Sequence, residues 1–257
     1  MRFPKAYYDR EEKARLLTAS TKIVGFAPAS AEDKPFDAEK EPDLASKLDF
    51  ETWLPFAAKA YHISPRIESY VIKAMPVCPS DFPNRNGIGF PLQELVRFQP
   101  PPMNRQVYKA WAGCPIHLEH DNEDPTKAYG VMFDTALTKI TGFGGGKHWK
   151  VMGLVGVDKD KHPDIAQELL DNKINTGSMG AMADSFTCSV CGRPASDNSL
   201  LNCSHVGSTR EVNWNVVDYM GQQHVAYLNA HGLSPIEYSI VRDPAWVSAM
   251  SDHILKW

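Results

Sequence analysis

A serine in a turn of small residues is the first candidate for chemistry. Residues 176–181 read TGSMGA, so Ser178 lies between Gly177 and Gly180. Glycines let the main chain bend closely around the hydroxyl and leave amides free to donate. A hydroxyl nucleophile needs such a position, a base within reach and donors for the oxyanion. Because Gly-Ser-x-Gly is more often an inert turn, this pattern alone leaves both interpretations open.

Two histidines in an acidic segment are the candidate bases. Residues 114–130 contain His117 and His120. Three acids follow them: Asp121, Glu123 and Asp124. In a strand the two rings would point to opposite faces, so we expect one of them to face a site. Histidine exchanges protons near neutral pH, but a solvated surface segment would have the same composition.

A third group would hold the imidazole in one tautomer and stabilise its charge. Glu237 is a candidate because it lies in the apolar strand-like run PIEYSIVRD (235–243). Asp184, just past the serine, is the other candidate. An acid in such a run faces solvent more often than it serves a site, so both interpretations stay open.

The cysteine spacing predicts a metal site. Residues 188–205 give Cys188-x2-Cys191-x11-Cys203-x-His205. Two thiolates from one turn, with a cysteine and a histidine from a second, complete a tetrahedral zinc shell. A closed shell has no open position for water, so we expect a structural Zn²⁺. His224 could replace His205, and the alternative is reduced cysteines without a ligand.

The composition is that of an ordinary globular protein and narrows the functional classes. The chain has 257 residues, 43% hydrophobic and 23% charged, and a formal charge of −4. That charge, and Arg193 as the one lysine or arginine within 188–205, argue against nucleic-acid binding. No apolar run approaches the roughly 20 residues that span a bilayer. With no signal-peptide core at the N-terminus, we expect an intracellular protein in a reducing compartment.

The elements that would position these residues point to an α+β fold with a mostly antiparallel β-barrel or sheet and flanking helices. The periodicity predicts helices at 43–63, 92–98, 162–175 and 244–255. It predicts strands at 68–77, 127–139, 149–158, from 176, at 211–220 and at 235–243. Residues 143–148, with three glycines, suit a hairpin turn. We divide the chain into an N-terminal arm (1–50) and one domain (51–257) with a zinc-binding insert (186–210).

Four segments occur in an order that resembles a known family. They are FPNRNGIGFPLQEL (82–95), the histidine–acid segment ending in DPTKAYG, the helix leading into TGSMGA, and IEYSIVRDPAWVSA (236–249). Together they resemble the capsid maturation (prohead core) serine proteases of tailed bacteriophages, whose fold is similar to herpesvirus assemblin. The similarity covers roughly residues 68–250, and some large-phage members have a similar cysteine insert.

The resemblance implies a role for each candidate. Ser178 would be the nucleophile and His120 the general base, with His117 as competitor. Glu237 would complete the triad, with Asp184 in reserve, and amides near Met179 and Gly180 would bind the oxyanion. The implied activity is cleavage of scaffold (core) proteins, of the N-terminal arm of the major capsid protein and of the protease itself. That places the chain in the host cytoplasm, inside the assembling prohead, and a homo-oligomer is compatible with this.

Two rival interpretations remain. The first is a catalytically inactive, zinc-stabilised capsid or scaffold assembly protein of the same fold. The second is a metallohydrolase with a ligand set from one segment: His117, His120, Asp121 and Asp124. Its helical His-Glu-x-x-His arrangement is missing, and Pro125 disrupts a helix there.

Overall fold

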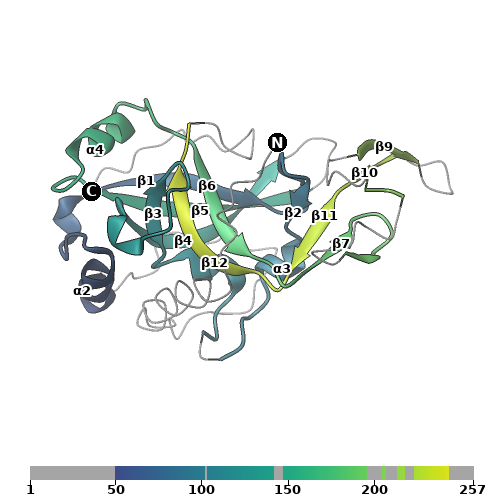
Figure 1. Ribbon diagram of the computed structural model, residues 1–257, viewed down its shortest axis with the longest axis horizontal. Coiled ribbons are helices and arrows are strands. Elements are labelled where there is room, and N and C mark those ends of the chain that lie inside the picture. The colour runs from purple at the N-terminus through teal and green to yellow at the C-terminus, as the bar shows by residue number, and fades with distance from the viewer. Residues whose placement is uncertain are drawn as a thin grey trace.

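The computed structural model describes residues 50–101, 103–141, 147–195, 204–206, 213–217 and 223–242. These residues form an α+β architecture in which strands dominate and the main sheet curls into a half-barrel (Figure 1). The predicted α+β class with a mostly antiparallel sheet is therefore confirmed. The N-terminal arm and the helix expected at 244–255 lie outside the described residues, as does most of the glycine turn at 143–148.

The main sheet has six strands in the order β1-β5-β4-β3-β12-β6. Their bounds are β1 Tyr70–Pro79, β5 Lys147–Asp158, β4 Gly130–Thr141, β3 Pro115–Leu118, β12 Ser234–Ile240 and β6 Gly177–Met182. Every neighbouring pair is antiparallel except β3 and β12, which run parallel. This one parallel pair brings the histidine segment beside the late acidic strand, two elements separated by more than a hundred residues.

Two smaller sheets continue from the main one. One has the order β2-β11-β7-β8, with β2 at Ile88–Gly89, β11 at Leu228–His231, β7 at Ser185–Cys188 and β8 at Pro194–Ala195. The other pairs β10 (Gln223–Ala226) with β9 (Asn213–Val217). Both extend to the right of the main sheet in Figure 1.

The helices of the described residues are short. They are α2 (Phe50–Tyr61), α3 (Leu92–Leu95) and α4 (Pro163–Leu170), with 3-10 turns η1 (Ile67–Ser69), η2 (Val107–Trp111) and η3 (Pro125–Lys127). No helix of the described residues is long and apolar enough to cross a membrane. The helix expected at 162–175 ends earlier because Asn172 is left-handed (φ 56°), which a continuing helix does not allow.

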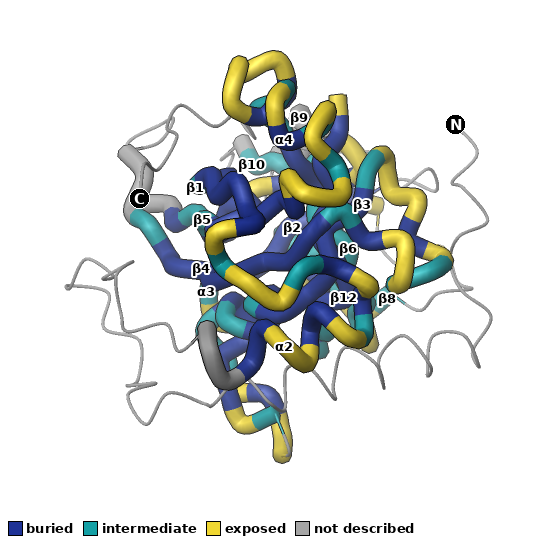
Figure 2. The backbone as a smooth tube through the Cα atoms, turned by 90° about the vertical axis from the view of Figure 1, so that its left-hand side faces the viewer, coloured by how far each residue is buried: buried dark blue, intermediate teal, exposed yellow. Residues whose placement is uncertain are grey.

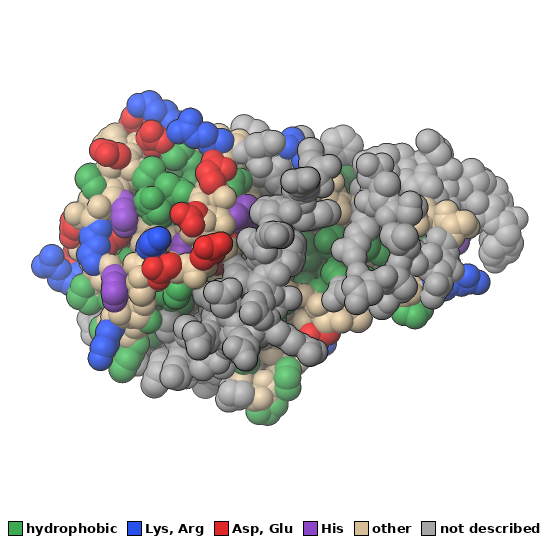
Figure 3. Space-filling model, viewed as in Figure 1, with side chains coloured by type: hydrophobic (Ala, Val, Ile, Leu, Met, Phe, Trp, Pro, Cys, Tyr) green, Lys and Arg blue, Asp and Glu red, His purple; other side chains and the backbone are tan. Residues whose placement is uncertain are grey.

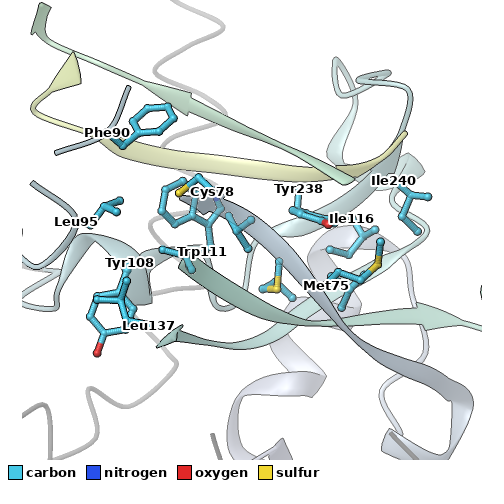
Figure 4. Packing of buried hydrophobic residues seen from close by; sticks show 14 of the residues in the cluster. Met75, Cys78, Phe90, Leu95, Tyr108, Trp111, Ile116, Leu137, Tyr238 and Ile240 are labelled. Carbon is cyan, nitrogen blue, oxygen red and sulfur yellow. The ribbon is translucent and has the colours of Figure 1, made fainter. Parts of the chain in front are cut away.

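The curl of the main sheet encloses the larger core. Tyr238 of β12 donates a hydrogen bond of 3.0 Å to the carbonyl of Pro76 on β1, although the two strands are far apart in the sheet order. Trp111, Met75 and Ile116 are fully buried in the same cluster (Figure 4). The apolar side chains of β12 that point into this core leave the alternate residues on the opposite face.

A second cluster covers the outer face of β4 and β1. Trp53 of α2 lies 5.8 Å from the ring of Phe133, and Tyr70 meets the same ring edge-on at 5.1 Å. The inner side of α2 is buried and its outer side exposed, as the alternating colours in Figure 2 show. The described strands of the main sheet are consequently apolar on both faces over much of their length.

A buried lysine fixes the connection that leads to the candidate serine. Lys73 on β1 is fully buried, and burial lowers its pKa. Its ammonium donates to Asn172 Oδ1 at 2.8 Å and to the carbonyls of Leu169 and Ile174 at 3.3 and 3.4 Å. These oxygens close the end of α4, four to nine residues before Ser178.

We predict that Lys73→Met destabilises the fold. The substitution removes the ammonium donor from Asn172 Oδ1 and the Ile174 carbonyl, whereas the Leu169 carbonyl keeps a main-chain donor, and the loss costs about 1–3 kcal/mol. Chemical denaturation followed by circular dichroism measures the change, and Lys59→Met, at an exposed position of α2, should change it by less than about 0.5 kcal/mol. Unchanged or higher stability of Lys73→Met would show that the cost of burying the ammonium outweighs its hydrogen bonds.

Candidate functional site

Two of the candidate side chains, Ser178 and His117, lie in one row across the main sheet, with Ser239 between them. Ser239 on β12 is the register partner of Ser178 on β6 and of His117 on β3. Register partners point to the same face of a sheet. Their chain neighbours Tyr238 and Ile116 belong to the enclosed core. The row therefore lies on the face opposite that core.

Glu237 lies on the same face, two residues from Ser239. The pairing of β12 with β6 shifts between Pro235 and Glu237, as it does at a β-bulge, and Glu237 then faces Gly180. A Cβ on Gly180 would lie 2.5 Å from Glu237 Oε1. The absence of a side chain on Gly180 thus leaves room for the Glu237 carboxylate to lie over β6. Glu237 is 1% exposed.

His120 reaches this carboxylate from a tight turn after β3. The amide of Asp121 donates to the carbonyl of Leu118 at 2.9 Å, and the two central residues, Glu119 and His120, have φ of 48° and 61°. Positive φ at both central positions defines a type I′ turn, which normally holds Asn and Gly. Each non-glycine residue in this region costs about 1–2 kcal/mol. The unfavourable backbone conformation thus includes His120, the residue that contacts Glu237.

The imidazole and the carboxylate form a direct pair. His120 Nδ1 lies 3.0 Å from Glu237 Oε1. Partial burial lowers the pKa of His120, but the hydrogen bond and charge of Glu237, with the charge of Glu119, raise it above its ordinary value. Nε2 makes no hydrogen bond with the described residues, so this nitrogen is free to take a proton. The His120 side chain is 43% exposed. Acidic, basic and histidine side chains all lie on the left-hand part of the face seen in Figure 3.

The imidazole lies close to the serine strand. The oxygen that bonds His120 is the same Oε1 that leans over Gly180. Ser178 is two residues from Gly180 on the same face, roughly 7 Å along the strand. No hydrogen bond joins Ser178 Oγ to either imidazole in the described part of the chain, and Ser178 is 5% exposed. The arrangement is an acid–imidazole pair beside a buried hydroxyl.

His117 is held in a different state. The ring is 1% exposed, and neither nitrogen makes a hydrogen bond with the described residues. Burial lowers its pKa, and this outweighs the opposing effects of Glu237, of Asp121 with its main chain, and of Asp124. Burial therefore favours the neutral form of this ring. His117 lacks the carboxylate contact that orients His120.

Asp184 lies away from the pair. It follows the end of β6, and its carboxylate lies against Gly232, where a Cβ would be 2.2 Å from Oδ2. The pKa of Arg97 is raised mainly by its hydrogen bond with Glu94, and the charge of Asp184 adds to this effect. The structure therefore brings together Ser178, His120 and Glu237, with His117 in the same row, and leaves Asp184 outside.

Sequence reasoning missed Ser239 and the role of Gly180. Ser239 is fully buried, donates to Glu237 Oε2 at 2.6 Å and accepts from the His120 amide at 3.2 Å. Its position two residues after an acid in a predicted strand was the available signal, since such residues share a face. The function of Gly180 depends on the strand register, which no local pattern reveals.

Three of the four predicted metal ligands come together at the end of β7. The ligand atoms of Cys188, Cys191 and His205 all lie within 4.8 Å of one another. Cys188 Sγ and His205 Nδ1 are 3.8 Å apart, against about 3.6 Å for sulfur and nitrogen on one tetrahedral zinc. Cys203 lies outside the described residues, and His224 is not part of this group.

The main chain around Cys188 fits a metal-binding turn. The Cys188 amide donates to the Arg193 carbonyl and the Gly192 amide to the Cys188 carbonyl, both at 2.9 Å. Gly192 has φ 68°, which favours glycine. The Val190 amide points at Cys188 Sγ from 3.4 Å and would stabilise a thiolate. This cluster could hold a metal ion.

The metal cluster and the serine lie on one continuous ribbon. Strands β6 and β7 are separated by two residues, as are β11 and β12. The Asp184 amide donates to the His231 carbonyl at 2.9 Å, so the ladder continues across both junctions. Cys188 pairs with Leu228 at one end and Ser178 with Ser239 roughly 30 Å away. In Figure 1 this ribbon links the two sheets.

The histidine–acid segment does not form a metal site. Among the described residues, the cysteine–histidine cluster is the one group of three or more potential ligands within such distances, and residues 117–124 are all described. His117 is enclosed while Asp124 binds its own turn through Thr126. A metallohydrolase built on this segment has no support in the geometry.

Compared with known proteins, the chain matches no family model, no curated protein and no solved structure. The residues and contacts of this chain therefore carry the functional conclusion.

We predict that Gly180→Ala separates Glu237 from His120. The added methyl takes the place of the carboxylate, so the pKa of His120 should fall, because the hydrogen bond and charge of Glu237 that raise it are lost. Titration of the histidine ring signals by NMR measures this, and Glu237→Gln should give the same direction. Asp184→Asn is the matched control and should leave the titration unchanged. A His120 pKa that stays raised in Gly180→Ala would contradict the pairing.

We predict that Cys188→Ser and Cys191→Ser abolish metal binding. Loss of the ion should lower the melting temperature by about 5 °C or more, since 1 kcal/mol corresponds to roughly 2–4 °C in a domain of this size. Metal content is measured by mass spectrometry, and Ser185→Ala, at an exposed position on the same strand, should leave it unchanged. Purified protein that contains no metal, with unfolding unaffected by chelator, would contradict the site.

Proposed function

We propose that the chain is a serine endopeptidase that uses Ser178 as nucleophile, His120 as general base and Glu237 as the orienting acid. The observation that carries this proposal is the 3.0 Å contact between His120 Nδ1 and Glu237 Oε1 beside the strand of Ser178. A carboxylate on Nδ1 fixes the tautomer in which Nε2 accepts a proton. Ser178 and Glu237 lie on the neighbouring strands β6 and β12, and His120 lies on the turn that directly follows β3.

The chemistry follows from these positions. Nε2 of His120 takes the proton of Ser178 Oγ, which attacks a peptide carbonyl. The same proton then passes to the leaving amine as the peptide bond breaks, and an acyl ester remains on Ser178. Water, deprotonated by the same imidazole, hydrolyses the ester and restores the hydroxyl. Main-chain amides near Met179 and Gly180 are candidates for the oxyanion donors.

The substrate class rests on the resemblance to the prohead proteases of tailed bacteriophages. By that resemblance the substrates are scaffold (core) proteins, the N-terminal arm of the major capsid protein and the protease itself, inside the assembling prohead. The assemblin-like fold belongs to the same proposal. The curled sheet with the serine strand at its edge is compatible with it.

The metal in this proposal is a structural zinc ion. Cys188, Cys191 and His205 would hold it, with Cys203 as the fourth ligand. Bound zinc would supply a closed tetrahedral link and no open coordination position. The small cluster around Cys188 includes Val206, Ala226 and Leu228 and offers little apolar support by itself. A metal link would compensate for that small core.

A second candidate function is an inactive assembly protein of the same fold. The burial of Ser178, together with its lack of a hydrogen bond to either imidazole, favours this alternative. Catalytic hydrogen bonds often tighten only when substrate binds, so the two candidates differ in whether the hydroxyl can react.

We predict that a fluorophosphonate probe labels Ser178 of the full chain. Peptide mapping by mass spectrometry locates the adduct, and Ser178→Ala should abolish it. His120→Gln should slow labelling at least about 100-fold, the range of general-base assistance. Because a protonated ring cannot accept a proton, labelling should fall as pH decreases through the raised pKa of His120. Ser185→Ala is the control and should label normally.

The outcomes separate the candidates. Labelling of Ser178 that depends on His120 supports the peptidase. A folded chain that is never labelled supports the inactive assembly protein. An adduct on another serine would show that the nucleophile is assigned wrongly.

A further inference from the structure

Ser239 connects the acid to the main chain of the histidine. Its Oγ donates to Glu237 Oε2 at 2.6 Å and accepts a hydrogen bond from the His120 amide at 3.2 Å. The side chain is fully buried, on a strand that pairs with β6 on one side and β3 on the other. Neither of these two contacts involves Nε2 of His120.

We propose that Ser239 is a positioning residue that holds the Glu237 carboxylate and the His120 turn in one fixed arrangement. Its catalytic meaning rests on the proposed peptidase function. The positioning itself concerns two contacts that exist without any substrate.

The carboxylate is fixed because its two oxygens have different partners. Oε2 accepts from Ser239, which leaves Oε1 for His120 and sets the plane of the group. Without the hydroxyl, a carboxylate that is 1% exposed loses one of its two donors. Hydrogen bonds in such a chain strengthen one another, so losing one weakens the next.

The turn at Glu119 and His120 is strained, so hydrogen bonds to β12 are needed to hold it in place. Glu119 and His120 both have positive φ, and relaxation of either would swing the imidazole away from Glu237. The His120 amide bond to Ser239 and the Glu119 amide bond to the Ile240 carbonyl, at 3.0 Å, tie the turn to β12. Ser239 thus supports both members of the pair.

The charged groups that act on His120 are few. Glu237 faces the ring from β12, and Glu119 lies beside it on the turn. Ser239 carries no charge, so removing it changes the His120 titration through geometry. This makes the titration a readout of positioning that a loss of general stability would not move.

The test compares Ser239→Ala with Ser80→Ala. Ser80 is also fully buried, and its Oγ accepts a main-chain hydrogen bond, from Trp149 at 3.1 Å, away from the site. In Ser239→Ala the His120 pKa measured by NMR should fall by about 0.5 units or more, and probe labelling of Ser178 should slow about tenfold. Ser80→Ala should lose stability and change neither. Ser239→Thr keeps the hydroxyl and should keep both the His120 titration and the labelling rate as in the wild type. Ser239→Val, in which the side chain has about the same volume as threonine but no hydroxyl, should not.

The two proposals can fail separately. If Ser239→Ala, or Ser239→Val where the alanine variant does not fold, titrates like Ser239→Thr or wild type, the positioning role is overturned. If the titration shifts as expected but wild-type Ser178 is never labelled, the positioning stands and the peptidase function falls. If the His120 titration is unshifted but labelling of Ser178 is slower, the positioning role is also overturned, since the Ser239 hydroxyl would then act by some other route.

Discussion

The antiparallel pairing of β6 with β12 is the constraint on which the rest of the site depends. It places Ser178 opposite Ser239 and Gly180 opposite Glu237. A slip of β6 by one residue would turn its side chains to the opposite face, so that Ser178 would point into the core and Met179 out of it. The burial of that core therefore fixes the register, and the register assembles the polar row.

The same ribbon explains why a metal cluster lies so near in sequence and so far in space. Its distal half, β7 with β11, is backed by a small apolar cluster, whereas the proximal half rests on the large core. A link at Cys188 would hold the weak end and so limit fraying toward Asp184. The ion would then act on the site only through the ladder, as support for a pairing that the core already specifies.

Some elements of the fold could be predicted from the sequence and others could not. The long apolar strands β1, β4, β5 and β12 and the amphipathic α4 follow from periodicity, and the cysteine spacing correctly indicates the cluster, of which three ligands are described. Strands β7, β10 and β11 were missed because their residues are mixed in polarity, and β7 and β11 are strands because they extend β6 and β12. The site residues Ser178, His120 and Glu237 could be proposed from their types. The parallel pairing of β3 with β12 makes Ser239 the link among these site residues. It joins segments that are far apart in the sequence, and no local sequence pattern predicts such a pairing.

At two places near the site, the structure departs from the conformational preferences of the individual residues. A type I′ turn with Glu119 and His120 at its centre goes against the intrinsic preference of both residues, and Gly180 weakens an edge strand that other residues would stabilise. Both departures serve one contact, because the turn delivers the imidazole and the glycine admits the carboxylate. Local rules are broken in this way mainly where a particular side-chain geometry is required. The pair is therefore not an incidental surface ion pair, since an exposed pair of that kind contributes little and would not offset such a cost, whereas Glu237 is 1% exposed.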